Sequence, residues 1–228
     1  EEVDSAKNTK VKAGNYHKHL LAGNPHHEAV VRYAASCRLW NTQQTIPWSD
    51  SGPRIVTMEN LFNGGYKQEL DNRKAEFERL VDVFLGVYPT LISAAAFQLG
   101  DLFDREEYPD PEVIRNKFKF NYTLTPIPTA NDFRIDIGEQ AKRELVEQYE
   151  AAFNERLGNA MRDVWDRLHD CLTHMSERLA DDEEGKRKLF HGTLLTNARE
   201  LIDLLARLNV TQDAKLEEAR RDLQSALL

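Results

Sequence analysis

The sequence contains only two cysteines, Cys37 and Cys171, among its 228 residues. Both lie in stretches with helical spacing, which excludes a disulfide framework and favours a reducing compartment. Glycine and proline contribute only 11 and 8 residues, a low share that excludes collagen-like or low-complexity chain and favours long regular elements. The longest apolar run, Leu91 to Phe97, is far below the roughly 20 residues of a membrane span. We therefore expect a cytoplasmic protein with no membrane partner.

The chain also lacks a basic block and a phosphate-binding loop. It has 30 Lys and Arg residues against 38 Asp and Glu residues, so its formal net charge is −8. An acidic balance removes the counterion release that supplies most non-specific affinity for nucleic acid, which is therefore not an expected partner. Gly64-Gly65 lies in a helical pattern without the Lys-Ser or Lys-Thr of a phosphate loop, so we do not expect nucleotide binding.

Histidines are frequent near the N-terminus, but their spacing does not predict a metal site. The residues concerned are His17, His19, His26 and His27. A spacing of two on a helix points side chains in nearly opposite directions, and a metal needs three or four converging ligands. His169 and His174 are five residues apart, whereas a zinc-binding helix pair would be four apart. We expect these histidines to be structural or on polar surfaces, and we predict no metal or other cofactor.

Two further features could supply catalytic groups. Cys37 lies on a predicted helix face with no histidine placed by sequence to activate it, so a buried position is expected. The segment Asp101 to Glu112 has six carboxylates and one basic residue, Arg105, and the acids within Asp104 to Glu107 could serve hydrolysis. Such a cluster is more often a solvated loop, and next a docking patch for a basic partner. No catalytic residue is predicted, and we do not expect an enzyme.

Two tryptophans, Trp40 and Trp48, flank a loop that contains Pro47 and Pro53. Tryptophans are common anchors of protein interfaces. Trp40, however, continues an apolar helix face, and the prolines order Trp48 against the body of the protein. Core packing is therefore the preferred interpretation, with interface contact as the alternative.

Apolar spacing of three and four residues predicts helices over most of the chain. They cover Asn15 to Trp40 with a break at Gly23-Asn24-Pro25, Thr57 to Tyr88, Pro89 to Leu99, Pro111 to Lys117, Glu139 to Ala180, Leu194 to Leu208, and Ala214 to Leu227 with Thr211 as N-cap. A loop with one short strand at Arg54 to Val56 follows the first helices. Proline at the first turn of a helix explains why Tyr88 should end one helix and Pro89 begin the next.

A change to period two predicts a β-hairpin at about 118–137. Apolar and polar residues alternate over Phe118 to Thr125 and again over Phe133 to Ile137. The predicted fold is α+β and predominantly helical, with a bundle or helical hairpin beside this small antiparallel element. We expect a helical region at 1–137 and a long helix with two C-terminal helices at 138–228, together forming one elongated unit.

The longest predicted helix, from about Glu139 to Ala180, carries an apolar stripe interrupted only by Gly158. About 40 residues of helix extend about 60 Å, so its apolar stripe needs a cover. Either a second copy of the chain covers it, or a break at Gly158 lets it fold back within one chain. We favour self-association, with the end near Met175 exposed.

Two blocks of the chain resemble an uncharacterised family of bacterial and phage proteins. In the N-terminal half the similar residues are Asn8 to Gly14, Arg32 to Ala35, Arg38 to Trp40, Thr45 to Trp48, Gly52 and Arg54. In the middle they are Phe84 to Pro89, Leu99 to Phe103, Tyr108-Pro109, Phe118, Pro126, Pro128, and Asp132 to Gly138. The family is often encoded beside a MoxR-type AAA ATPase and a protein with a von Willebrand factor A domain. The resemblance implies an accessory role and transfers no functional residue.

These observations lead to three hypotheses. The first is a non-enzymatic adaptor or scaffold, acting with an AAA ATPase in a bacterial or phage-infected cytoplasm. The second is a phage-encoded inhibitor that blocks a host defence system through an acidic surface. An enzyme is the third, and a pocket with converging titratable groups would distinguish it.

Overall fold

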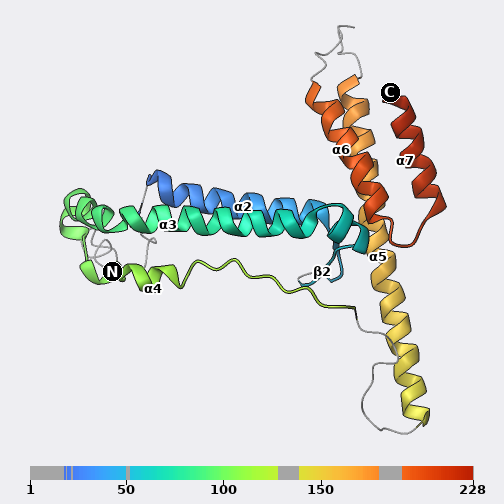
Figure 1. Ribbon diagram of the computed structural model, residues 1–228, viewed down its shortest axis with the longest axis horizontal. Helices are drawn as coiled ribbons and strands as arrows, with labels where there is room; N and C mark the ends of the chain where they lie inside the picture. The colour runs from blue at the N-terminus through green and yellow to red at the C-terminus, as the bar shows by residue number, and fades with distance from the viewer. Residues whose placement is uncertain are drawn as a thin grey trace, which may run out of the picture. The chain divides into compact units, whose positions relative to one another are not determined.

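The computed structural model describes residues 18, 20–21, 23–49, 52–127, 139–179 and 192–227. The elements are α2 (Pro25–Gln44), β1 (Ile46–Pro47), β2 (Arg54–Ile55), η1 (Glu59–Asn63), α3 (Tyr66–Leu99), η2 (Gly100–Leu102), η3 (Arg105–Glu107), α4 (Pro111–Arg115), α5 (Glu139–Leu179), α6 (Gly192–Leu208) and α7 (Ala214–Ala226) (Figure 1). The described residues are therefore predominantly helical with one small antiparallel sheet, which confirms the predicted fold class.

Contacts divide the chain into two units, each with its own hydrophobic core. Unit 1 comprises Glu1–Ser36 and Arg73–Tyr122, and unit 2 comprises Cys37–Asn72 and Thr123–Leu228. Two of the boundaries fall inside α2 and α3, so both helices contribute residues to both units. The boundary predicted near residue 137 lies outside the described residues.

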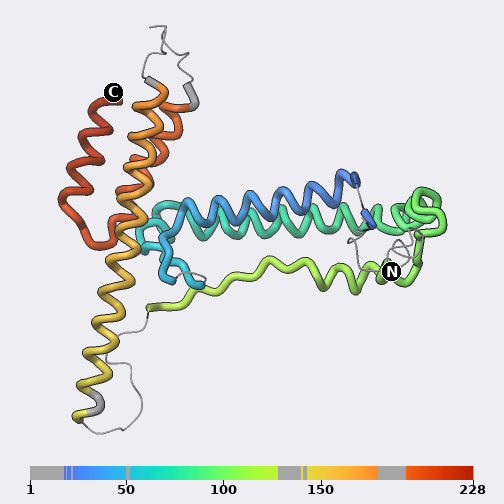
Figure 2. Tube along the Cα trace, turned by 180° about the vertical axis from the view of Figure 1, so that it is seen from behind, coloured from blue at the N-terminus to red at the C-terminus, as the bar shows by residue number. Residues whose placement is uncertain are grey.

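The core of unit 1 forms where the first half of α2 lies along α3 (Figure 2). Asn24 begins α2 as its N-cap, because its Oδ1 accepts the backbone N–H groups of His26 and His27 at 3.1 and 2.9 Å. Apolar residues at helical spacing then meet across the two helices. The buried members are Val30, Phe77, Val81, Phe84, Leu85, Tyr88, Ala95 and Tyr108.

Helix α3 continues through Pro89, which corrects the predicted end at Tyr88. A proline inside a helix removes one backbone hydrogen bond and strains the preceding turn. Here Leu85 and Tyr88 before the proline and Ala95 after it are all buried in the same core, with exposed fractions of 6%, 1% and 5%. Tertiary packing on both sides of Pro89 therefore outweighs the local preference for a break.

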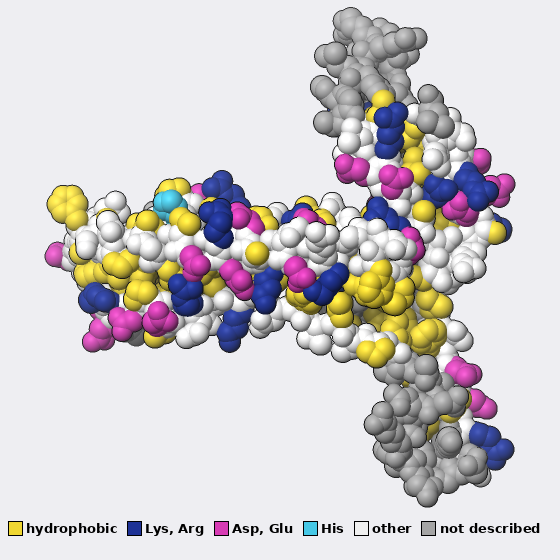
Figure 3. All heavy atoms as spheres, in the orientation of Figure 1, with side chains coloured by type: hydrophobic (Ala, Val, Ile, Leu, Met, Phe, Trp, Pro, Cys, Tyr) yellow, Lys and Arg dark blue, Asp and Glu magenta, His cyan; other side chains and the backbone are white. Residues whose placement is uncertain are grey.

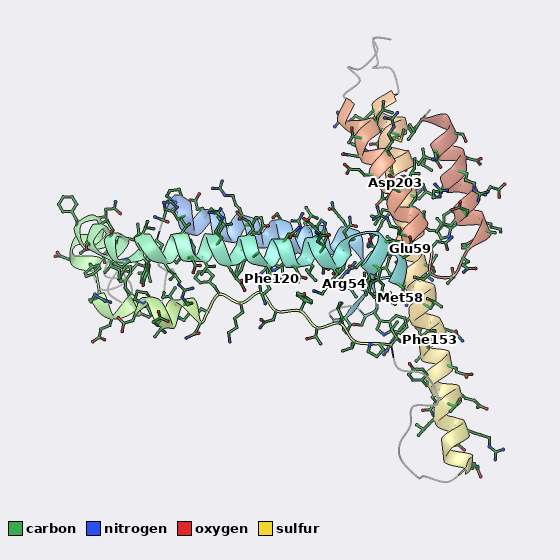
Figure 4. The ribbon with its side chains drawn as sticks, viewed as in Figure 1. Arg54, Met58, Glu59, Phe120, Phe153 and Asp203 are labelled. Carbon is green, nitrogen blue, oxygen red and sulfur yellow. The ribbon has the colours of Figure 1, made fainter. Side chains whose placement is uncertain are left out.

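The predicted hairpin at 118–137 is wrong in its first strand. Residues 118–127 have no ladder partner among the described residues, and Phe133 to Ile137 lie outside them. The period-two pattern is nevertheless real, because Phe118, Phe120 and Tyr122 are half-buried while the residues between them are exposed. The ring centroid of Phe120 lies 5.8 Å from that of Phe77 on α3 (Figure 4). The alternating face thus packs as extended chain on a helix.

The small sheet lies instead in the loop between α2 and η1. β1 and β2 pair antiparallel, with Ile46 opposite Ile55 and Pro47 opposite Arg54. The sequence predicts the strand β2, but it predicts irregular loop rather than a strand at Pro47. A proline is tolerated here because both strands of a two-stranded sheet are edges.

The π-helical segment η1 and two glycines, Gly64 and Gly65, interrupt the helix predicted from Thr57 before α3 begins. Gly65 has φ +71°, a conformation that residues with a Cβ rarely adopt. A Cβ on Gly64 would lie 2.3 Å from Oδ1 of Asn60, so this position admits only glycine without rearrangement. The glycines thus separate η1 from α3.

The core of unit 2 forms where α6 and α7 cover the C-terminal half of α5. Its fully buried apolar residues are Ile46, Ala160, Val164, Leu168, Ala198, Leu205, Leu208 and Leu216. Helix α5 is continuous through Gly158. Met175 is buried, with an exposed fraction of 9%, so the predicted exposure near Met175 is wrong. Toward the N-terminal end of α5, Leu145 is 37% exposed.

Helix α7 begins at an Asp213 N-cap, which corrects the predicted cap at Thr211. Asp213 Oδ1 accepts the backbone N–H of Lys215 at 2.9 Å, and Trp165 Nε1 of α5 donates to Oδ2 at 3.1 Å. The Trp165 hydrogen bond, followed by the backbone N–H groups, lowers the pKa of Asp213. The cap therefore joins α7 to α5.

We expect acid to loosen α7. Hydrogen bonds from Arg220 and then Arg221 lower the pKa of Glu217 to about 2, and the pKa of Asp213 is also lowered. A carboxyl whose pKa is lower in the folded state stabilises the fold above its unfolded pKa and loses that effect as it is protonated. The contribution should therefore disappear between about pH 4.5 and pH 2, and Trp165 fluorescence should report it.

The matched variants for this acid transition are Glu217→Gln and Glu218→Gln on the same helix. Glu217→Gln should reduce the fluorescence change, because the contribution of Glu217 is absent and only that of Asp213 remains. Glu218 is exposed, so its variant should follow the original curve. Identical curves for Glu217→Gln and the unchanged protein would contradict this assignment.

Candidate functional site

Two arginines of unit 2 hold the C-terminus of α2. Arg167 donates from Nη1 to the carbonyl oxygen of Gln43 at 2.7 Å, and from Nη2 to those of Thr42 and Thr45 at 3.0 and 2.8 Å. Arg54 donates to the carbonyl oxygens of Thr42 and Thr45 at 3.1 and 2.9 Å. The last carbonyl groups of a helix have no partner within it, and cations stabilise that end of its dipole. Burial, and next repulsion from Arg167, lower the pKa of Arg54.

A buried asparagine extends this network toward α6. Asn60 of η1 is fully buried and donates from Nδ2 to the carbonyl oxygen of Gln44 at 2.7 Å. Its Oδ1 accepts from Arg207 at 3.3 Å, and Thr57 donates to the carbonyl oxygen of Arg207 at 2.7 Å. Because these side chains donate to backbone carbonyl oxygens at the ends of α2 and α6, the network stabilises the fold.

The histidines and cysteines considered in the sequence do not converge. The structure describes His26, His27, His169 and His174, whereas His17 and His19 lie outside the described residues. Within the described ranges, no group of three or more histidine, cysteine, aspartate or glutamate residues could hold a metal ion. Cys37 is buried, and burial raises the pKa of Cys171, which disfavours its reactive thiolate form.

The tryptophans pack inside unit 2. Trp40 stacks on Tyr66 with ring centroids 5.1 Å apart, and Trp48 meets Phe153 of α5 edge-on at 5.2 Å. Arg156 lies over the Trp48 ring at 5.9 Å. Both tryptophans are half-buried, so the preferred interpretation of core packing agrees with the contacts.

The most exposed large apolar side chain in the described residues belongs to unit 1. Phe97, near the end of α3, is 92% exposed. It ends a line of exposed uncharged residues spaced three or four apart, which places them on one side of the helix. We call this line the α3 face: Val83, Gly86, Thr90, Ala94 and Phe97. It lies opposite the buried residues Phe84, Leu85 and Tyr88.

An acidic loop, residues 101–112, follows α3 directly. Its six carboxylates, Asp101, Asp104, Glu106, Glu107, Asp110 and Glu112, are all exposed. Figure 3 shows acidic side chains gathered near hydrophobic ones at this end of unit 1. The solvated loop predicted from the sequence is therefore present.

The acidic loop is anchored in the core of unit 1. Tyr108 is 2% exposed, stacks on Phe103 with centroids 5.4 Å apart, and donates its hydroxyl to the carbonyl oxygen of Leu20 at 3.2 Å. Burial raises the pKa of Tyr108, which stays a neutral donor. Lys18 pairs with Glu107, and that hydrogen bond raises the pKa of Lys18. The carboxylates are thus held on an ordered loop.

By length and composition alone, the segment Tyr66–Leu102 is apolar enough to cross a membrane. Its most apolar window is only 28% buried. This segment has no long unbroken apolar run, but its stretch Val83–Gly100 contains no charged residue. The same test is passed by core helices of soluble proteins, so it does not by itself indicate a membrane.

Two grooves lie on the described part of the chain, one in each unit. The groove of unit 1 has a volume of about 370 Å³ and an apolar floor of Phe77, Val81 and Phe120, with the ion pair of Asp82 and Arg115 at its rim. The groove of unit 2 has a volume of about 270 Å³ and lies between Trp48 and the extended residues 123–127. Glu78 and Lys119 also line the groove of unit 1, and Arg54 lines the groove of unit 2.

Comparisons with family models, curated proteins and solved structures found no match to this chain. The family resemblance of the sequence therefore stays a prediction. The α3 face and the acidic loop are the two candidate surfaces. The exposure of Phe97 was not predicted from the sequence, although the absence of charge over Val83–Gly100 was a signal for it.

Proposed function

We propose that this chain is a non-enzymatic adaptor or scaffold that binds a partner protein through the α3 face. One observation carries the proposal: Phe97 is 92% exposed at the end of an uncharged helix face. Contiguous exposed apolar surface is unfavourable in water and marks interaction sites. Because the face belongs to a helix whose opposite side is packed in a core, it is presented by a rigid element.

The first candidate partner is an AAA ATPase in a bacterial or phage-infected cytoplasm. The support is the resemblance to a family encoded beside a MoxR-type AAA ATPase and a protein with a von Willebrand factor A domain. An adaptor of this kind would change the rate of ATP hydrolysis by its partner when it binds.

The test compares Phe97→Gln with Phe62→Gln. Phe62 of η1 is 68% exposed in unit 2, so both variants remove an exposed aromatic ring without adding charge. Two quantities are measured with the purified AAA ATPase that is encoded beside this chain: its affinity for the chain and the change in its rate of ATP hydrolysis. Both should fall about tenfold for Phe97→Gln and stay unchanged for Phe62→Gln. No association by the unchanged chain, or equal losses for both variants, would overturn the proposal.

A second candidate is a phage-encoded inhibitor of a host defence system. The observation that favours it is the anchored acidic loop, which holds six exposed carboxylates. An inhibitor of this kind should restore plaque formation on a restricting host, and Asp101→Lys with Glu106→Lys should abolish that effect. Equal plating with and without the chain would remove this candidate.

We further expect self-association through the N-terminal half of α5. Leu145, Tyr149, Phe153 and Leu157 recur every four residues there, with Leu145 exposed and the others half-buried. A second copy would bury this stripe, so light scattering should give a mass above that of one chain at micromolar concentration. Leu145→Glu should reduce the mass, whereas Leu172→Glu, a 44% exposed position on the covered half, should not. A one-chain mass unchanged on tenfold concentration would contradict this prediction.

A further inference from the structure

The groove of unit 2 lies beside an edge of the small sheet. Residues 53–56, which include β2, line it together with Trp48 and the extended residues 123–127, whereas neither residue of β1 does. All of these residues belong to unit 2, and Figure 1 shows the extended segment passing close to β2. The groove is therefore next to β2 on the side away from β1.

The backbone of β2 has unpaired hydrogen-bonding groups along this edge. The Trp48 N–H donates to the carbonyl oxygen of Pro53 at 3.1 Å, which makes these two residues a hydrogen-bonded pair of the ladder. Such pairs alternate with non-hydrogen-bonded ones, so Arg54, opposite Pro47, turns its N–H and C=O away from β1. Within the described residues, these groups of Arg54 and those of Val56 have no hydrogen-bond partner. Free groups at alternate residues of an edge strand are complementary to an extended chain.

The second wall of the groove supplies apolar contacts. Residues 123–127 are exposed, and in the part of the chain that the structure describes their backbone makes no hydrogen bond. Leu124 and Ile127 are 43% and 41% exposed. A peptide that adds a strand to a sheet gains affinity from main-chain hydrogen bonds and specificity from its alternate side chains. The groove of unit 2 offers partners for both.

The charge of the groove restricts which peptide can bind. Arg54 is the one charged side chain among the described lining residues, and Arg156 lies 5.9 Å from the ring centroid of Trp48. Arg54 donates from Nε and Nη2 to Thr42 and Thr45, whereas its Nη1 has no acceptor within the described ranges. Two cations without a lining carboxylate favour an acidic ligand.

We infer that the groove of unit 2 binds an extended acidic peptide segment of a partner protein, which adds a strand to β2. The backbone of the segment exchanges hydrogen bonds with Arg54 and Val56, its apolar side chains pack on Trp48 and Ile127, and a carboxylate lies toward Arg54. The inference goes beyond the proposed adaptor contact, because it uses a different surface on the other unit. A scaffold with both surfaces would hold two partners at once.

The test uses three labelled synthetic peptides of about eight residues, a common strand length. The first alternates valine with glutamate, the second alternates valine with lysine, and the third is the glutamate peptide with every backbone nitrogen methylated. Binding to the full chain is followed by fluorescence anisotropy. The glutamate peptide should bind and the other two should not, and raising the salt from about 50 to about 300 mM should weaken binding. Equal binding of all three peptides, or of none, overturns the inference.

Two variants of Val56 separate the backbone from the side chain. Val56→Pro removes the N–H at the β2 edge and should weaken binding of the glutamate peptide about tenfold. Val56→Ala keeps that N–H and should lose much less affinity. Equal affinities for the two variants overturn strand addition. Should Val56→Pro fail to fold by circular dichroism, the exposed positions of the second wall decide the question.

Substitutions on the second wall locate the peptide. Ile127→Gln should weaken binding of the glutamate peptide, whereas Leu172→Gln, at a 44% exposed position of α5, should not. Thr125→Glu places a carboxylate in the groove and should lower affinity for the glutamate peptide about tenfold. Gln148→Glu adds the same charge at an exposed position of α5 outside the groove and should leave affinity unchanged. Equal losses for test and control variants would show non-specific attraction and overturn the inference.

Two further measurements exclude other occupants. Free glutamate that displaces the peptide at equal concentration would show an anion site only and overturn the inference. A second copy of the chain, pairing through β2, would give a mass that falls in Val56→Pro, and that result would also overturn it. Phe97→Gln should bind the glutamate peptide as the unchanged chain does, so loss of its ATPase association tests the adaptor function separately.

Discussion

Phe84→Ala should lower the free energy of unfolding by about 4 kcal/mol. Phe84 is 1% exposed and its ring contacts those of His27, Tyr88 and Phe118 at centroid distances of 5.5 to 5.8 Å. Alanine would remove these contacts and leave a cavity between α2, α3 and the extended segment. Urea denaturation would measure the loss, and hydrogen exchange would show where it occurs.

Because the two units have separate cores, the loss of exchange protection should concentrate in unit 1. Amides of Val81 to Leu99 should exchange faster, while those of Ile202 to Leu208 should keep their protection. Phe120→Ala, at a half-buried position, should have a smaller effect, about 1 to 2 kcal/mol. Equal loss of protection in both segments would contradict the division into two cores.

Arg167→Ala should lower the free energy of unfolding by about 3 kcal/mol. Its guanidinium donates three hydrogen bonds to the C-terminal carbonyl groups of α2 and pairs with Asp163 at 2.8 Å. Alanine would leave the carbonyl oxygen of Gln43 without its charged donor and Asp163 without its cation, while Arg54 would still donate to the carbonyl oxygens of Thr42 and Thr45. Thermal or urea denaturation would measure the difference.

Arg162→Ala on the same helix is the matched control. Arg162 is exposed and donates only to the Asn159 side chain, so its loss should change stability by less than about 0.5 kcal/mol. Arg167→Lys should give an intermediate loss, because an ammonium group cannot reach three carbonyl oxygens with the geometry of a guanidinium fork. Equal stability of Arg162→Ala and Arg167→Ala would refute the capping role.

Local signals predicted most helices well, because helix formation depends on contacts within four residues. Asn24 and Pro25 mark the start of α2, and helix α5 runs without a break over the predicted range. Local preference gave the wrong end for the helix at Pro89, because residues on both sides of the proline are buried in one core. It also failed at 118–127, where a period-two face packs on a helix and lacks a second strand among the described residues.

The candidate site was predicted only in part. The acidic loop follows from its composition, since six carboxylates in one segment favour solvent. Whether a given face of α3 is exposed depends on which elements cover it, and those elements come from distant parts of the chain. The exposure of Phe97 therefore could not be derived from spacing alone.

The sequence by itself determined the helical class, the position of α5 and the acidic character of residues 101–112, because spacing, capping residues and charge act over a few neighbouring residues. Only the tertiary structure decided that α3 passes through Pro89, that Arg54 and Arg167 meet at the end of α2, and that Trp48 packs on Phe153 of α5. Each of these depends on contacts between residues far apart in the chain, whose energies no local pattern contains.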